Sequence, residues 1–288
     1  MSIQDNQDSS GYRRALRSKL NGLAFALRNF WRWQPPVFQE ALIAEQPQIL
    51  QSDPAVALKA HQLLQHYDLT RLPAKSSESR QLENLTYLEW LDAFLQSRPQ
   101  AFEQLSAFSC LNWLDVGAKN WAYVDALDAF IRTHFDTAYR LDGLELDPHR
   151  RYANLTTRAQ AAENYTRGLA NAQYHEVNAM DWRRKAHIIS QFMPFVSPDP
   201  HLAWGLPLEY FQPLELLNHL LGLLQPGGLL LVVNQGTWEA EAQERLWQQV
   251  RGEWPITVVP LGVLPASFMA YRYPRYGWLC QKAEGPEQ

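Results

Sequence analysis

The sequence is poor in cysteine, and it lacks the long apolar runs that mark membrane-spanning chains. Its 288 residues contain two cysteines, Cys110 and Cys280, which excludes a disulfide framework. We therefore expect two buried free thiols in a reducing compartment, the cytoplasm. No run of about eighteen apolar residues occurs, so no spanning helix is expected. The N-terminus, MSIQDNQDSSGYRR, lacks the apolar segment of a secretory signal.

Zinc-site spacing and a strong overall charge are also missing. No Cys/His cluster has the spacing of a zinc site, so no metal is expected. The net charge of −4 does not suggest nucleic-acid binding by the whole surface. Acidic residues are absent from residues 12–33, which carry six basic ones, so the rest of the chain has a charge of about −10. The six are Arg13, Arg14, Arg17, Lys19, Arg28 and Arg32.

The basic segment 12–33 is predicted to form a helix with one apolar face. Its apolar residues recur every three or four positions, namely Leu16, Leu20, Leu23, Leu27 and Phe30. Two interpretations stay open. Arg13, Arg14 and Arg17 suggest an anionic partner, which could be a phosphorylated substrate, nucleic acid or an acidic membrane surface. Alternatively, the apolar face docks on the rest of the protein and the arginines face water.

The chain changes its periodicity after about one hundred residues. We expect a disordered tail at 1–11 and a helical N-terminal domain at 12–108, because apolar residues there follow helical spacing. From Leu111 strands alternate with helices, which predicts a second domain at 109–283. Expected strands are 111–116, 139–146, 173–178, 187–195 and 229–233, and expected helices are 121–134, 149–168, 213–224 and 238–251.

The last two strands, Ile256 to Leu264 and Tyr276 to Lys282, have no helix between them, so they should pair antiparallel. The prediction is an α/β fold in which a mostly parallel, Rossmann-like sheet is closed by a C-terminal antiparallel hairpin.

Two segments of the second domain have the pattern of a nucleotide-binding site. LNWLDVGAKNWAY (111–123) is a strand with Asp115 near its end and Gly117 opening a helical segment. Such a turn gathers backbone N–H groups and the positive end of a helix at one point. GLELDPH (143–149) is a second strand that ends in Glu145, and an acid at that position can hold a ribose.

Together with LLQPGGLLLVVNQG (223–236), these segments resemble class I S-adenosylmethionine-dependent methyltransferases over roughly residues 105–283. The family's first loop has an acid followed by three glycines at alternate positions. Asp115 and Gly117 match, whereas Lys119 and Trp121 stand where the second and third glycines would be. The resemblance implies S-adenosylmethionine as cofactor. Lys119 could pair with the methionyl carboxylate or fill the site, or Lys119 and Trp121 could simply pack the loop.

The resemblance also implies the residues that hold the nucleoside. Glu145 stands at the position of the ribose acid; Asp147 is an alternative, although it better fits the cap of a helix that Pro148 begins. Asn178, after the third strand, stands where the family contacts the adenine edge. Asp181 could serve instead with a shift in register, and a plain turn residue is the other interpretation.

Catalytic candidates lie in SQFMPFVSPDPHLAWGLPLEYF (190–211), the fourth strand and its loop. Amino-methylating relatives place Asn or Asp, two prolines and an aromatic here, and Gln191 is the polar residue at that position. His201 could act as a general base near neutral pH, or it could be structural. Four prolines should make the loop rigid, and rigid loops at strand ends line sites in open sheets.

We therefore predict a methyltransferase of unknown acceptor. Its N-terminal helices should cover the active face of the sheet and shape the pocket. A catalytically inactive relative that binds or regulates is the alternative, because the glycine loop is degenerate. A nicotinamide-dependent oxidoreductase ranks below both, since Gly117 stands without the other two glycines of that motif.

Overall fold

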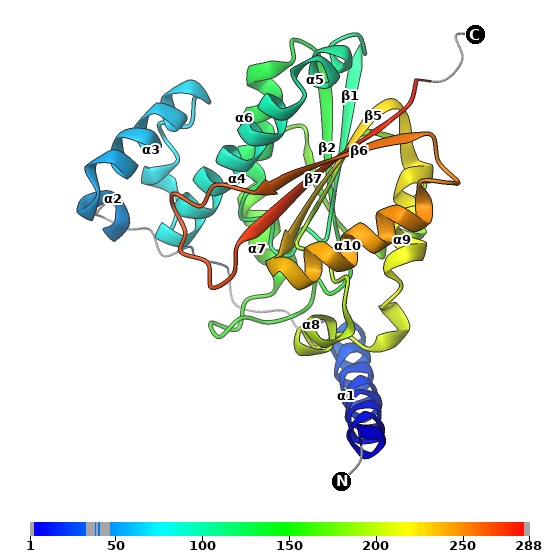
Figure 1. Ribbon diagram of the computed structural model, residues 1–288. Helices are drawn as coiled ribbons and strands as arrows, with labels where there is room; N and C mark the ends of the chain where they lie inside the picture. The colour runs from blue at the N-terminus through cyan, green and yellow to red at the C-terminus, as the bar shows by residue number, and fades with distance from the viewer. Residues whose placement is uncertain (1–2, 33–37, 39, 41–46, 285–288) are drawn as a thin grey trace.

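A computed structural model describes residues 3–32, 38, 40 and 47–284 of the chain (Figure 1). Within these residues, seven strands form one sheet in the order β3-β2-β1-β4-β5-β7-β6. The strands are β1 (Cys110–Val116), β2 (Ala138–Glu145), β3 (Ala172–Glu176), β4 (Ala186–Phe192), β5 (Leu224–Gln235), β6 (Ile256–Val263) and β7 (Arg275–Lys282).

The sheet is parallel from β3 to β5 and antiparallel beyond it. β7 pairs antiparallel with β5, from Leu229 opposite Gln281 to Gln235 opposite Arg275, and β6 pairs antiparallel with β7. The predicted Rossmann-like sheet closed by a C-terminal antiparallel hairpin is thus confirmed. The carboxyl ends of the parallel strands all lie at one edge, which is where ligands of open α/β sheets bind.

Helices cover both faces of the sheet. The helices of the described residues are α1 (Ile3–Trp31), α2 (Gln48–Ser52), α3 (Pro54–His66), α4 (Glu78–Ser97), α5 (Pro99–Leu105), α6 (Val124–His134), α7 (Arg158–Thr166), α8 (Pro198–Ala203), α9 (Pro213–Leu223) and α10 (Gly236–Val250), with short 3₁₀ turns η1 (Pro73–Lys75), η2 (Ala179–Asp181) and η3 (Leu208–Tyr210). α4, α5 and α6 share one hydrophobic core with one face, and α9 and α10 share a second core with the other face.

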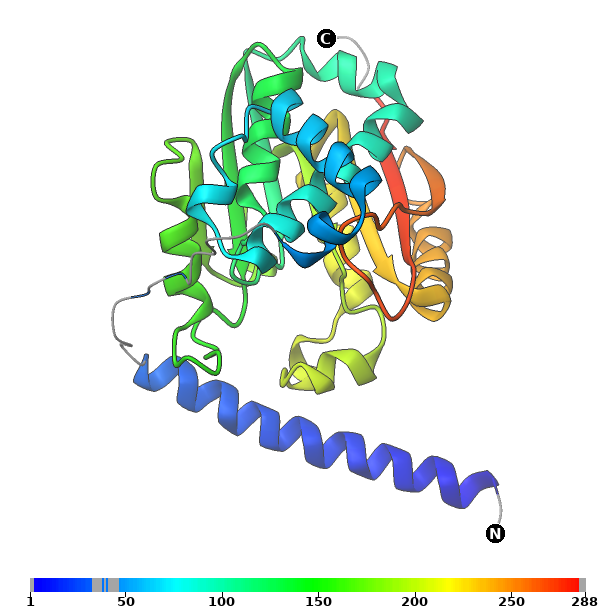
Figure 2. The same cartoon turned by 90° about the vertical axis from the view of Figure 1, so that its left-hand side faces the viewer.

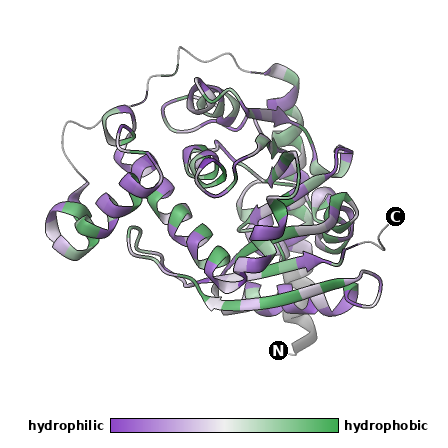
Figure 3. Cartoon of the chain, turned by 90° about the horizontal axis from the view of Figure 1, so that it is seen from above, coloured by the Kyte–Doolittle hydropathy of each residue, from purple (hydrophilic) through white to green (hydrophobic). Residues whose placement is uncertain are grey.

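Residues 229–233 of β5 are apolar at every position, and the structure shows why. Leu229, Leu231 and Val233 belong to the first core, whereas Leu230 and Val232 belong to the second. Successive side chains of a strand point to opposite faces, so a strand buried on both faces needs an unbroken apolar run. Figure 3 shows hydrophobic residues along the strands.

The helices that precede the sheet pack against the same core as the strands. Asp53 caps α3 as the Asp-Pro pair predicts, because its Oδ1 accepts from the backbone N–H groups of Ala55 (2.9 Å) and Val56 (3.2 Å). Leu63 of α3 and Leu88 of α4 lie in the first core with β1 and β4. The division into domains 12–108 and 109–283 stays a prediction.

The helix expected at 149–168 is shorter than predicted. α7 begins at Arg158, and Thr157 caps it by accepting from the backbone N–H of Gln160. Residues 149–157 form a loop in which Arg151 and Thr157 make an isolated antiparallel bridge. The predicted capping role of Asp147 is therefore wrong. Its buried carboxylate instead accepts from Nε (3.1 Å) and Nη2 (2.9 Å) of Arg28 in α1.

Smaller expectations also need correction. Cys110 is exposed at the start of β1, so of the two free thiols only Cys280 is buried, and burial raises the pKa of Cys280 to about 12. β5 begins at Leu224, five residues before the expected strand. Among the described residues, no helix combines the length and the apolarity needed to cross a membrane.

Helix α1 lies along the outside of the molecule (Figure 2). The apolar stripe of α1 consists of exposed side chains, namely Leu16, Leu20, Leu23, Leu27, Phe30 and Trp31. The interpretation that this face docks on the rest of the protein is wrong. α1 begins at Ile3, so helix replaces most of the expected disordered tail at 1–11. The expected last residue of this helix, Trp33, lies outside the described residues.

The Arg28–Asp147 pair should hold α1 in place. In an Arg28→Gln variant the buried carboxylate of Asp147 would keep, among the side chains that the structure describes, only the cation of Arg150, whose Nη1 lies 3.9 Å from Oδ2. A charge-assisted hydrogen bond is worth about 1–3 kcal/mol, so we expect amide hydrogen exchange in α1 to speed up by roughly tenfold or more. Arg13→Gln, on the exposed side of the same helix, is the control. Equal exchange in both variants would contradict this anchoring role.

Candidate functional site

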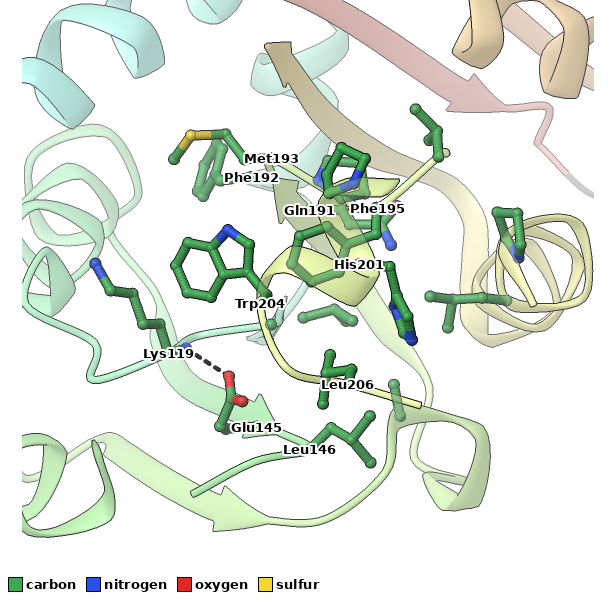
Figure 4. A pocket seen from close by; sticks show the side chains of 18 of the residues that line it. Lys119, Glu145, Leu146, Gln191, Phe192, Met193, Phe195, His201, Trp204 and Leu206 are labelled. Carbon is green, nitrogen blue, oxygen red and sulfur yellow. Dashed lines mark hydrogen bonds between the residues drawn. The ribbon is translucent and has the colours of Figure 1, made fainter. Parts of the chain in front are cut away.

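A cavity of about 510 Å³ opens at the carboxyl ends of the parallel strands (Figure 4). Gly117 from the loop after β1, Glu145 from the end of β2 and Asn178 from the loop after β3 all line it. Gln191 and His201, the two catalytic candidates, line it as well. The sequence therefore identified residues that lie around one cavity, although they come from four separate segments.

The loop after β1 keeps a glycine-like backbone without the glycines. Gly117 has φ +81°, Lys119 has φ +57° and Trp121 has φ +52°, so all three alternate positions are left-handed. A Cβ on Gly117 would meet no atom within 4 Å, which leaves its backbone open to the cavity. Left-handed backbone costs a residue with a Cβ about 1–2 kcal/mol, so the rest of the structure must hold Lys119 and Trp121 in this conformation.

Trp121 packs beneath the loop. Its side chain is fully buried, and a Cβ on Gly143 of β2 would lie 2.7 Å from the indole ring. The missing side chain of Gly143 thus makes the space that the tryptophan fills. The interpretation that Lys119 and Trp121 simply pack the loop is therefore correct for Trp121 but not for Lys119, which lines the cavity.

Asp115 lies below the cavity rather than on its wall. Its carboxylate accepts from Tyr123 Oη (2.7 Å) and from Ser190 Oγ (2.5 Å), and it is fully buried. Burial raises the pKa of Asp115 to about 6, although both hydroxyl groups favour its charged form. Tyr123 does line the cavity, so Asp115 can act on a ligand through this tyrosine.

Glu145 is already engaged by three protein donors. Its Oε2 accepts from the backbone N–H of Lys119 at 2.8 Å (Figure 4), and its Oε1 accepts from the N–H of Asp147 and from Arg158 Nη1, both at 2.8 Å. The side chains of Glu145 and Arg158 are 7% and 6% exposed. A carboxylate oxygen can accept two hydrogen bonds, so Oε2 keeps one free position toward the cavity.

Arg158 is a site residue that sequence reasoning missed. It opens α7 and pairs with Glu145, but the helix was expected to begin nine residues earlier, which put Arg158 mid-helix. Its guanidinium carbon also lies 5.3 Å from the ring centroid of Trp204, and Lys119 Nζ lies 6.0 Å from the same centroid. Trp204 belongs to the loop after β4, so cation–π contacts bring that loop over the end of β2.

Asn178 lies at the cavity as the resemblance implies, and it is also a turn residue. Its side-chain Oδ1 accepts from the backbone N–H of Met180 at 3.0 Å and caps the short η2. Its Nδ2 therefore remains as the donor that a ligand could meet. Asp181, the alternative, has an exposed side chain, whereas Asn178 lines the cavity.

The two catalytic candidates differ in their surroundings. Gln191 is buried in β4 at the cavity wall. His201 is also buried, and its Nε2 lies 2.9 Å from the carbonyl oxygen of Pro207. A carbonyl only accepts, so Nε2 carries the proton and Nδ1 is left as the acceptor of the neutral ring. Burial lowers the pKa of His201, which favours this neutral form.

Residues far apart in sequence complete the cavity, and no motif pointed to them. Glu83 and Tyr87 come from α4, which therefore shapes the pocket as the sequence analysis expected of the N-terminal helices. Tyr87 stacks on Tyr123 with ring centroids 3.8 Å apart. Burial raises the pKa of Glu83, although the charge of Lys119 opposes this shift.

On the far side of the cavity, Arg275 lies over the ring of Tyr271, 4.0 Å from its centroid. Its guanidinium is buried, and its Nε has no hydrogen-bond partner among the described residues. Burial lowers the pKa of Arg275 and raises the pKa of Tyr271 to about 12. An unpaired buried donor is costly, so this end of the cavity favours a ligand with an acceptor group.

Among the comparisons with known proteins, only the comparison with solved structures found similar proteins. No family model matches the chain, and no curated protein matches it. Among solved structures, it is similar to a putative class I S-adenosylmethionine-dependent methyltransferase from Listeria monocytogenes, with 12% identity, 69% of this chain and 60% of that chain covered, and a TM-score of 0.47.

It is also similar to the plantazolicin methyltransferase BpumL, in complex with a desmethylplantazolicin analogue and S-adenosylhomocysteine (11% identity, 82% and 100% covered, TM-score 0.46). An rRNA methylase from Streptococcus thermophilus is a third (11% identity, 66% and 95% covered, TM-score 0.41). All three likenesses are distant, and the fold assignment rests on the sheet itself.

The left-handed backbone at Lys119 should reverse the usual order of alanine and glycine. We expect Lys119→Gly to be more stable than Lys119→Ala by about 1 kcal/mol in urea unfolding, because only alanine has a Cβ to strain. At the exposed Arg245 of α10, the same pair should show alanine as the more stable by about 1 kcal/mol. The same order at both positions would rule out strain at Lys119.

Asp115 should make the protein less stable as the pH rises. Its folded pKa of about 6 exceeds the ordinary 3.8, so the folded state holds the proton more tightly than the unfolded state. The free energy of unfolding then falls as the pH rises through 6. Between about pH 5 and about pH 7.5 the parent should lose about 1 kcal/mol more than Asp115→Asn, measured by urea unfolding. Parallel pH profiles of the two proteins would show that Asp115 does not titrate in this range.

Proposed function

We propose that the protein is an S-adenosylmethionine-dependent methyltransferase. The observation that carries the proposal is that Gly117, Glu145 and Asn178, from three successive strand ends, line one cavity of about 510 Å³. These are the positions at which the sequence resembles the family's cofactor site. The mostly parallel sheet closed by an antiparallel β7 is also the arrangement that the resemblance implies.

The donors and acceptors of the cavity fit such a cofactor. The free position on Glu145 Oε2 can accept from a ribose hydroxyl, and Asn178 Nδ2 can donate to the adenine edge. The open backbone at Gly117 allows close approach of a ligand. Lys119 lines the same cavity, and its ammonium can pair with the methionyl carboxylate.

When bound, S-adenosylmethionine supplies a methyl group on a positively charged sulfur, and alignment of the acceptor gives most of the rate. The chain's own residues would position the acceptor and exclude water. Gln191 offers an amide oxygen at the cavity wall, and Nδ1 of the neutral His201 can accept a proton from an acceptor that loses one. The loop after β4 closes this side of the cavity with Phe195 and Leu206.

A catalytically inactive binding or regulatory protein is the second candidate. The observation that favours it is the engagement of Glu145 by Lys119, Asp147 and Arg158, which leaves one position for two ribose hydroxyls. The sequence QFMPF (191–195) also departs from the family's catalytic pattern. Cofactor binding without methyl transfer to any amine, hydroxyl or carboxylate acceptor would support this second function.

We also propose a cytoplasmic location and an anionic partner at Arg13, Arg14 and Arg17. Arg14 already pairs with Asp199 of α8, with Nε 2.8 Å from Oδ1. Arg13 and Arg17 are exposed on α1. An anionic partner of α1 would therefore meet Arg13 and Arg17 first.

Calorimetry with S-adenosylmethionine, S-adenosylhomocysteine and NAD tests the proposal. We expect heat of binding with the first two and none with NAD. Glu145→Gln should weaken S-adenosylhomocysteine binding by about 1–3 kcal/mol, roughly 5- to 150-fold, because a charge-assisted hydrogen bond is lost. Glu163→Gln, on the exposed face of α7, is the matched control. No heat with either adenosyl ligand at about millimolar concentration would refute the proposal. Unchanged affinity in Glu145→Gln would refute only the ribose assignment.

A further inference from the structure

Helix α1 has its polar side inward and its apolar side outward. The apolar stripe of α1 (Leu16, Leu20, Leu23, Leu27, Phe30 and Trp31) is 45–81% exposed, and its members recur every three or four residues along one side of the helix. Figure 2 shows α1 running below the body of the protein. A contiguous apolar surface of this kind marks an interaction site.

The opposite side of α1 is fixed to the protein by polar contacts. Asn21 Nδ2 donates to the carbonyl oxygens of Leu202 (2.9 Å) and Leu206 (3.0 Å), and Ser18 Oγ accepts from the N–H of Leu208 (2.8 Å). The pairs Arg14–Asp199 and Arg28–Asp147 lie on this side too. These contacts hold the apolar stripe away from the body, so the helix cannot bury it there without breaking them.

Cations flank the stripe, and no anion does. Arg13 and Arg17 lie along one border and Lys19 along the other, as the 3.6-residue period requires, and all three are exposed. Residues 12–32 contain no acid. A helix with an apolar face, basic borders and aromatic residues has the composition of helices that lie in the surface of a membrane rich in anionic lipid.

A second copy of the chain fits this surface less well. Two facing α1 stripes would bring the basic segment 12–32 of one helix against that of the other. This segment holds no carboxylate to pair with the cations, because the two aspartates of α1, Asp5 and Asp8, precede the stripe. A nucleic acid would pair with Arg13, Arg17 and Lys19 but would leave the six apolar side chains in water. An anionic bilayer surface satisfies both features.

We propose that α1 binds the surface of membranes that contain anionic phospholipids, with its apolar stripe in the acyl boundary and Arg13, Arg17 and Lys19 at the headgroups. The protein body then lies on the side of α1 that faces away from the bilayer. The loop that α1 holds, residues 198–211, lines the cavity through His201 and Leu206. Binding therefore places this wall of the cavity next to the membrane surface. This inference does not depend on methyl transfer.

The test is co-sedimentation of the full chain with vesicles. We expect binding to vesicles of phosphatidylcholine with about 30% phosphatidylserine, at least about tenfold weaker binding to phosphatidylcholine alone, and loss of binding as salt increases. Leu20→Gln with Leu23→Gln should reduce binding at least about tenfold, because both side chains belong to the stripe. Both are exposed, and glutamine is a good helix former, so circular dichroism should be unchanged.

Arg13→Gln with Arg17→Gln and Lys19→Gln should abolish the preference for phosphatidylserine. The matched control removes three exposed arginines elsewhere, in Arg167→Gln, Arg245→Gln and Arg251→Gln, and should bind like the parent. The proposal is overturned if the parent does not bind phosphatidylserine vesicles, or if the leucine variant binds as well as the parent. It is equally overturned if sedimentation shows a dimer that the leucine changes dissociate while vesicles leave it intact. RNA binding that needs the basic residues but not the leucines, without vesicle binding, would also refute it.

Discussion

The carboxylate of Glu145 is the contact on which the geometry of the site depends. It holds the backbone of Lys119 from the loop after β1, the backbone of Asp147 after β2 and the guanidinium of Arg158 at the start of α7. Three segments that carry candidate site residues are thus fixed by one buried group. Charge-assisted hydrogen bonds at such a node are strong because little water competes for them. The left-handed backbone of Lys119 persists because its N–H is bound there.

The same node connects the cavity to the exterior helix. The N–H of Asp147 binds Glu145, and the carboxylate of Asp147 accepts from Arg28 of α1. Asn21 and Ser18 of the same helix form hydrogen bonds with the loop after β4. The wall of the cavity is therefore held from both of its sides. A displacement of α1 would therefore shift the positions of His201 and Glu145, because short series of polar contacts connect them to the helix.

The sequence predicted the sheet well because its signals are local. Alternating strands and helices, apolar runs and Asp-Pro caps depend on neighbouring residues. The sequence-based predictions were wrong where a residue far away in the sequence determines the local structure. Asp147-Pro148 has the form of a helix start, but Arg28, more than one hundred residues earlier, binds the carboxylate that would cap it. The apolar periodicity of α1 was read correctly, but periodicity does not say which way the face points. Gly117, Glu145 and Asn178 were found from their places at strand ends, whereas Glu83, Arg158 and Arg275 reach the cavity only through tertiary packing.

The tryptophan at position 121 has a consequence for how this chain can change over time. Trp121 occupies the volume that a side chain on Gly143 would need, with only 2.7 Å between its ring and the position of that Cβ. The two positions are therefore coupled in volume. A relative with glycine at position 121 has room for a larger residue at position 143, and a relative with tryptophan at position 121 does not. Positions 121 and 143 should therefore change together in divergent sequences. The order of their changes would show whether the glycine at 121 was lost before or after the side chain at 143.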